Sequence, residues 1–103
     1  MTPRDPQTLE RVKAILEKIS AIAPGHAVEL RIPPFAAIQC VEGAKHTRGT
    51  PPAVVEMNAE TLFALTKGEL SWDTGINEGF IIASGERSNL EPLFSALSKK
   101  MAS

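Results

Sequence analysis

A polar segment near the middle of the chain combines residue types that bind anions. Lys45, His46 and Arg48 lie close together, beside two threonine hydroxyls and a glycine. Arginine side chains and backbone N–H groups near glycine are well suited to carboxylate and phosphate groups. The segment therefore predicts a site for the anionic head group of a ligand. The alternative is a solvated turn whose charges pair with Glu42 and Glu56 on the adjoining strands.

The residues that could support catalysis or bind a metal form a weaker pattern. A catalytic thiolate needs a neighbouring base and electropositive surroundings, and His46 is the nearest imidazole to Cys40 in the sequence. Free cysteine is among the most buried residue types, so a buried, inert thiol is the better interpretation. His26 and His46 lack partners at the close spacing of zinc ligands, and no phosphate loop or nucleophile elbow is present. We expect no catalytic residue, no metal and no cofactor, and so a protein that is not an enzyme.

The composition narrows the class of protein. The chain of 103 residues suits one domain, residues 1–103, and its 43% hydrophobic and 22% charged residues are ordinary for a soluble globular protein. A net charge of −1 argues against a nucleic-acid partner, because phosphate recognition needs a surplus of Lys and Arg. The N-terminus lacks the apolar region of a secretion signal. No apolar run approaches the roughly 20 residues that cross a bilayer, so we expect a cytoplasmic protein without stable membrane insertion.

Two periodicities predict the elements of the first half. Apolar residues recur at intervals of three and four between 9 and 22, which predicts an amphipathic helix that Asp5 caps and Pro24-Gly25 ends. Apolar and polar residues alternate over 26–32, which predicts a strand. Further strands are expected at 35–42, 53–57 and 80–84. The run at 35–42 is apolar at successive positions, which is typical of a strand covered on both faces.

Helix signals dominate the second half. Asn58 and Ser71 are N-caps for two short helices, which Gly68 and Gly79 end, and a final helix begins near Asn89. The order is therefore one helix, three strands, two short helices, a strand and a helix. This order predicts an α+β domain, with helices packed on one face of a mainly antiparallel sheet of four to five strands.

Glycines bound the elements of the second half at regular places: Gly68-Glu69-Leu70, then Gly79-Phe80-Ile81-Ile82-Ala83-Ser84-Gly85, then the helix from Asn89. This arrangement over Asn58–Leu97 resembles the second half of the sterol-carrier-protein (type two) domain. The segment CVEGAKHTRGTPPAVVE is similar to a bacterial, actinobacterial branch of sterol-carrier orthologues. The resemblance implies a five-stranded sheet with helices on one face. It also implies an elongated apolar cavity between them for sterols, fatty acids or acyl-coenzyme A thioesters.

The resemblance also implies which residues would surround that cavity. They are apolar and come from the elements that enclose the cavity in the family: Leu62, Leu65, Trp72, Ile76, Phe80, Leu93, Phe94 and Leu97. Small-molecule sites are concave and mostly apolar, so these residues predict a pocket, and we expect Trp72 to border it. The alternative is that the same side chains fill the core at crystal-like density and leave no space.

The function predicted from the sequence is a non-catalytic carrier of an apolar small molecule or lipid. The expected ligands are a fatty acyl chain, an isoprenoid or a sterol-like lipid, with an anionic head group bound at Lys45, His46 and Arg48. The resemblance to a bacterial branch makes an acyl chain or isoprenoid the better expectation than a sterol. The alternative is a protein–protein interaction or enzyme-accessory module of the same fold with a closed cavity, pairing as a homodimer or with a partner enzyme.

Overall fold

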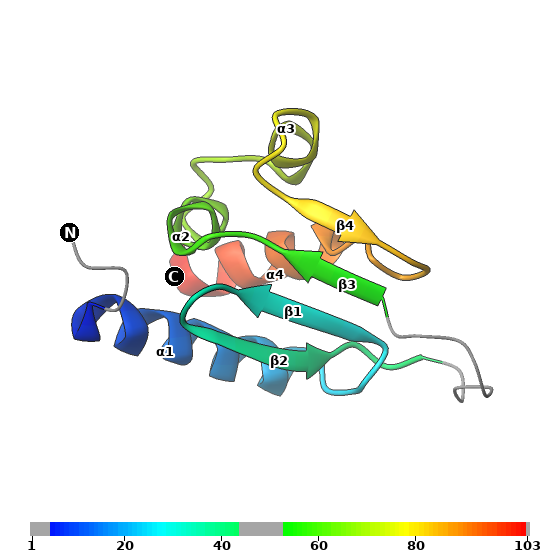
Figure 1. The fold of residues 1–103 in the computed structure, drawn as a ribbon, viewed down its shortest axis with the longest axis horizontal. Coiled ribbons are helices and arrows are strands. Elements are labelled where there is room, and N and C mark those ends of the chain that lie inside the picture. The colour runs from blue at the N-terminus through cyan, green and yellow to red at the C-terminus, as the bar shows by residue number, and fades with distance from the viewer. Residues whose placement is uncertain (1–4, 44–52, 103) are drawn as a thin grey trace.

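The computed structural model describes residues 5–43 and 53–102 (Figure 1). The elements follow the predicted order of helices and strands, and they confirm the α+β class. Their bounds are α1 (Pro6–Ile22), β1 (Val28–Ile32), β2 (Ala36–Cys40), β3 (Ala53–Glu56), α2 (Ala59–Thr66), α3 (Trp72–Asn77), β4 (Ile82–Ser84) and α4 (Glu91–Ala102). None of the helices in the described ranges is long and apolar enough to span a bilayer.

The strands form a mixed sheet in the order β2-β1-β3-β4. The pairs β1–β2 and β3–β4 are antiparallel, whereas β1 and β3 run parallel. The sheet is thus mainly antiparallel, as expected, with one parallel pair at its centre. The register aligns Ile38, Leu30, Val55 and Ala83 across all four strands. One row of apolar side chains therefore crosses the sheet on a single face.

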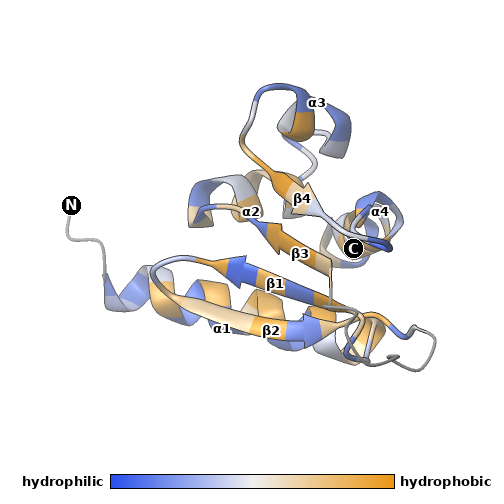
Figure 2. Ribbon diagram, turned by 45° about the vertical axis from the view of Figure 1, so that its right-hand side comes forward, coloured by the Kyte–Doolittle hydropathy of each residue, from blue (hydrophilic) through white to orange (hydrophobic). Residues whose placement is uncertain are grey.

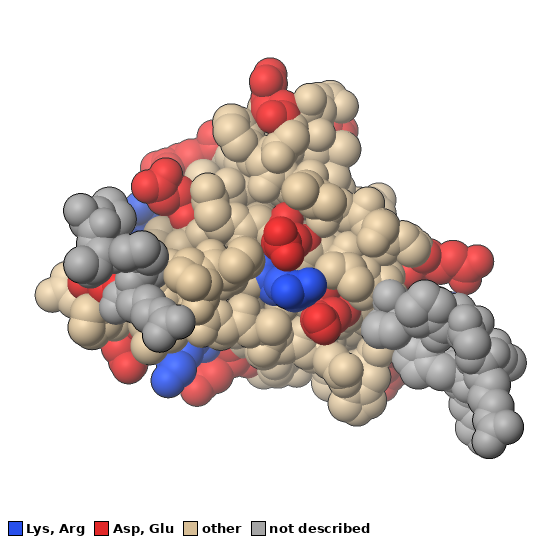
Figure 3. All heavy atoms as spheres, in the orientation of Figure 1, with Lys and Arg blue, Asp and Glu red and all other residues tan. Residues whose placement is uncertain are grey.

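Helices cover that apolar face and leave the other one open. In Figure 1, α1 and α4 lie behind the sheet. Alternate residues of β1, including Leu30, are fully buried, while Arg31 between them is exposed. The expectation that the second strand is covered on both faces is wrong. Ala37 and Gln39 of β2 are exposed, because no helix covers the outer face. Figure 3 shows this open face, which is mostly uncharged.

The first helix packs the face that its periodicity predicts. Val12, Ile15, Leu16 and Ile19 are all buried, and hydrophobic and hydrophilic residues alternate along α1 in Figure 2. Full burial of each such side chain contributes about 1.5–3 kcal/mol before entropy is subtracted. The helix begins where Asp5 accepts a hydrogen bond from the backbone N–H of Thr8 at 3.2 Å. This confirms the predicted cap.

The turn after α1 joins the helix to the end of β2. The backbone N–H of Val41 donates a hydrogen bond to the carbonyl oxygen of Ala23 at 2.8 Å. The backbone N–H of Ala27 donates one to the carbonyl oxygen of Val41 at 2.9 Å. Gly25 lies against this junction with φ +142°, and a Cβ there would come within 2.2 Å of the Val41 oxygen. Only glycine fits both this backbone conformation and this close approach.

The caps of the later helices position the segment that forms the site. Asn58 Oδ1 accepts a hydrogen bond from the backbone N–H of Thr61 at 2.8 Å, and Ser71 Oγ accepts one from that of Thr74 at 3.1 Å. Both residues are the predicted N-caps. The last helix begins at Glu91, so Pro92 lies in the first turn, where a missing N–H costs no helical hydrogen bond.

Candidate functional site: a cleft between α4 and the α2–α3 segment

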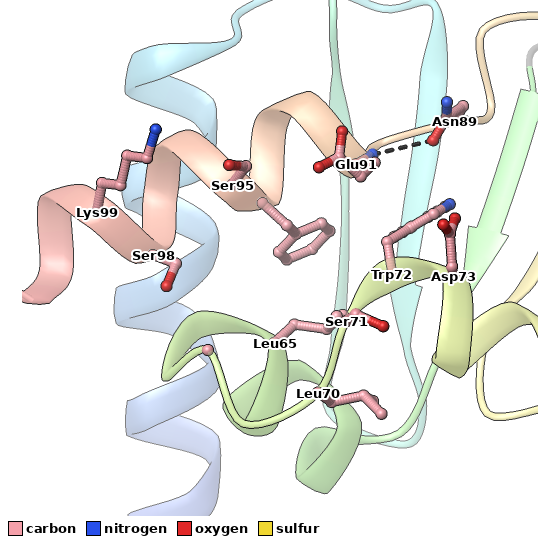
Figure 4. A pocket seen from close by; sticks show the side chains of 12 residues that line it. Leu65, Leu70, Ser71, Trp72, Asp73, Asn89, Glu91, Ser95, Ser98 and Lys99 are labelled. Atoms are coloured by element: carbon pink, nitrogen blue, oxygen red, sulfur yellow. Dashed lines mark hydrogen bonds between the residues drawn. The ribbon is translucent and has the colours of Figure 1, made fainter.

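An open cleft of about 500 Å³ lies beside α4. Its other side is the segment from Leu65 to Asp73, which runs from the end of α2 into the start of α3 (the α2–α3 segment). Figure 4 shows the cleft from close by, with α4 above and the α2–α3 segment below. The lining residues are Leu65, Gly68, Leu70, Ser71, Trp72, Asp73, Asn89, Glu91, Phe94, Ser95, Ser98 and Lys99. Two elements that are distant in the sequence therefore form one site.

Two stacked aromatic rings form the floor of the cleft. The ring centroids of Trp72 and Phe94 are 6.0 Å apart and the ring planes differ by 21°. These residues are 7% and 3% exposed, so both are held in the core and present only a small part of their surface to the cleft. Such a pair contributes about 0.5–1.5 kcal/mol beyond its buried area. Leu65 and Leu70 extend this apolar surface. The floor is therefore buried and mostly apolar.

Polar side chains form the rim. Glu91, Ser95 and Lys99 are spaced four residues apart along α4, which places them on one helix face. Asn89 Oδ1 accepts a hydrogen bond from the backbone N–H of Glu91 at 3.1 Å. Ser71 is engaged in the cap of α3. The cleft therefore combines an apolar floor with polar groups along its margin, as small-molecule sites do.

The structure distributes the eight predicted pocket residues over several environments. Leu65, Trp72 and Phe94 line the cleft. Leu62 and Leu97 are fully buried in the core, and Leu93 is partly buried against it. The remaining two, Ile76 and Phe80, are exposed and are absent from the cleft lining.

The predicted head-group residues Lys45, His46 and Arg48 lie outside the described residues. The structure instead places other polar groups around the cleft, and sequence reasoning missed them: Ser71, Asp73, Asn89, Glu91, Ser95, Ser98 and Lys99. The four-residue spacing along the last helix was a usable signal for some of these. The facing residues of α3 had no such signal, because only the tertiary structure brings the two helices together.

The single thiol has no reactive environment. Cys40 is fully buried, and burial raises the pKa of its thiol from 9.0 to about 11. A nucleophilic cysteine needs a lowered pKa and a neighbouring base. The described residues contain no group of three or more His, Cys, Asp and Glu side chains arranged to hold a metal ion. The cleft is thus the feature of the described chain that is best suited to bind a ligand.

Comparison with known proteins identifies the family. The fold is similar to the solved structure "UbiJ-SCP2 Ubiquinone synthesis protein", with a TM-score of 0.55 and 12% identity over 100% of this chain and 98% of that one. At this identity the likeness concerns the fold alone. The search of curated proteins found no match. The family model for bacterial SCP orthologs matches residues 4–95, which is most of the sequence. The chain therefore belongs to the family of bacterial sterol-carrier-protein orthologs.

Proposed function

We propose that this protein is a non-catalytic, cytoplasmic carrier that holds the apolar tail of a lipid, either a fatty acyl or an isoprenoid chain, in the cleft between α4 and the α2–α3 segment. Its family and its sterol-carrier-like fold support a lipid-binding role in general. The observation that carries the specific proposal is the stacked floor of Trp72 and Phe94 in a cleft of about 500 Å³. This volume lies within the roughly 300–1,000 Å³ of small-molecule sites.

The shape of the cleft suits reversible binding. Each methylene that leaves water contributes about 0.8 kcal/mol, and the immobilisation of the chain offsets part of that gain. Because the cleft is open and its rim is polar, an alkyl tail would contact the apolar floor on one side and remain partly solvated on the other. We therefore expect a moderate affinity, which is what a carrier that releases its ligand requires.

The test is a titration of the protein with decanol and with decanoate, followed by the fluorescence of Trp72, the only tryptophan. We expect a change in emission and an increase in melting temperature with at least one of them. Ser95→Phe places a ring in the cleft from an exposed position and should weaken binding about tenfold, since it removes the space for the tail.

Ala96→Phe is the matched control. Ala96 is the next residue of α4, is exposed and does not line the cleft, so this variant should bind as the wild type does. Saturating ligand that changes neither the emission nor the melting temperature of the wild-type protein would count against the carrier proposal. Equal loss in both variants would place the binding site elsewhere.

One observation favours the interaction module as a second candidate. Phe80 is 52% exposed and Ile82 is 63% exposed, and both lie at or beside β4, an edge strand of the sheet. Exposed apolar side chains beside an edge strand are typical of a surface that pairs with another chain. Size-exclusion chromatography with light scattering tests a homodimer. A dimer that dissociates in Ile82→Lys but not in Ala96→Lys would favour this candidate.

A further inference from the structure

The indole N–H of Trp72 is an unused hydrogen-bond donor at the floor of the cleft. The side chain is more than nine-tenths buried, and within the described ranges no hydrogen bond is found from this N–H. Since no fully buried side-chain nitrogen or oxygen lacks a partner there, solvent must reach the indole nitrogen. Buried donors of this kind are satisfied by water or by a ligand. The cleft therefore offers a donor to whatever occupies it.

Two carboxylates line the cleft, and one of them lies at the end to which the indole nitrogen points. Asp73 lies in the first turn of α3 and Glu91 in the first turn of α4, where a helix favours negative charge. In Figure 4 the indole nitrogen of Trp72 points to the end at which Asp73 and Asn89 lie, whereas Lys99 lies at the opposite end. The donor thus lies at the end of the cleft that Asp73 lines, whereas the side chain of Glu91 extends away from that end, toward Ser95.

This arrangement distinguishes between head groups. A hydroxyl can accept a hydrogen bond from the indole N–H and donate one to a carboxylate. A ligand carboxylate can accept the first bond but meets the like charge of Asp73. An alkylammonium can donate the second bond but accept nothing. We propose, on the basis of the carrier function above, that the cleft selects lipid alcohols. The tail lies on the floor of Trp72 and Phe94, and the hydroxyl lies between Trp72 and the carboxylate of Asp73.

Calorimetric titration with decanol, decanoate and decylammonium at neutral pH tests this selectivity at constant chain length. Decanol should bind about tenfold more tightly than decanoate. The hydroxyl of decanol gains a hydrogen bond to a charged group, whereas the carboxylate of decanoate meets a like charge. Asp73→Asn should bring the two affinities close together. Trp72→Phe, which keeps an aromatic floor, should weaken decanol binding several-fold. Glu60→Gln, an exposed first-turn residue of α2 outside the cleft, should leave the ratio unchanged.

The outcomes separate this inference from the proposed function. If none of the three ligands binds, both are wrong. If all bind and decanoate equals or exceeds decanol in the wild type, the carrier function stands and the selection for alcohols is overturned. A preference for decanoate that disappears in Lys45→Gln, Arg48→Gln would support the anionic head-group site predicted from the sequence instead. A decanol preference that the cleft variants leave intact would also overturn the inference.

Discussion

The two halves of the sheet are covered differently. The half formed by β1 and β2 packs against α1, whose periodic face is buried, and β1 has three fully buried residues. At the other edge, β4 has three residues and no buried position, Phe80 and Ile82 are exposed, and the cleft opens between α3 and α4. The first half therefore stabilises the fold, and the second half offers surfaces that remain available to a ligand or partner. Closely packed layers favour stability, whereas binding requires space between layers.

Truncation of one apolar side chain in each half is the strongest test of this comparison. Leu30→Ala removes a fully buried side chain at the centre of the sheet and should reduce the free energy of unfolding by about 2–5 kcal/mol. Phe80→Ala, at a position 52% exposed, should change it by less than about 1 kcal/mol. Urea denaturation measures both values. Similar losses in the two variants would mean that the second half is as tightly packed as the first.

Glycine substitutions sharpen the same contrast. Gly25→Ala should lower the free energy of unfolding by about 3 kcal/mol, because φ is +142° and the new Cβ meets the Val41 oxygen. Gly79, at the end of α3, has φ +79° but nothing within 4 Å of an added Cβ. Gly79→Ala should therefore lower the free energy of unfolding by only about 1 kcal/mol, because the positive φ is the one unfavourable feature of the substitution. The difference between their urea midpoints is the measurement, and the reverse order would contradict the account.

Cys40 makes the first half sensitive to alkaline pH. Its pKa is raised to about 11 in the folded protein by burial, so the folded state keeps a proton that the unfolded state releases at lower pH. The stabilisation is fully present below the ordinary thiol pKa and is lost as the pH rises toward 11, by about 3 kcal/mol in total. Unfolding of wild type and Cys40→Ala over this range checks the difference, which should shrink as the pH rises. A constant difference would show that the thiol does not titrate differently on folding.

The open face of the sheet should show the smallest effect. Arg31 Nε lies 3.7 Å from Glu56 Oε1, and both side chains are partly exposed to solvent. Exposed ion pairs of this kind contribute about 0.2–1 kcal/mol and are screened by salt. Glu56→Gln should therefore change the free energy of unfolding by no more than this amount, and less in high salt. A larger, salt-independent loss would indicate that this face is buried against another chain.

Local patterns were sufficient to predict most elements. The spacing of Val12, Ile15 and Leu16 predicts the buried face of α1, and the caps Asn58 and Ser71 mark where the short helices begin. These features depend on contacts within a few residues, where the helical or strand period decides which side chains share a face. The order of the elements predicted the α+β class, and the family resemblance, carried by the placement of glycines, added the sterol-carrier-like type of fold.

Other features depended on contacts between distant parts of the chain. The parallel pairing of β1 with β3 and the exposed outer face of β2 follow from strand order and helix placement, which no local pattern encodes. For the same reason, Leu65, Trp72 and Phe94 line the observed cleft, whereas the other predicted pocket residues do not.

By itself, the sequence determined which residues are apolar, which faces they share and where the helices begin. The tertiary structure decided how far α4 stands from the α2–α3 segment, and hence which apolar residues fill the core and which line a cleft. Leu62 and Leu65 lie one turn apart on α2, yet Leu62 is fully buried in the core while Leu65 reaches the cleft. The physical reason is that periodicity gives the direction of a side chain, whereas the space it meets depends on the packing of a helix that is distant in sequence.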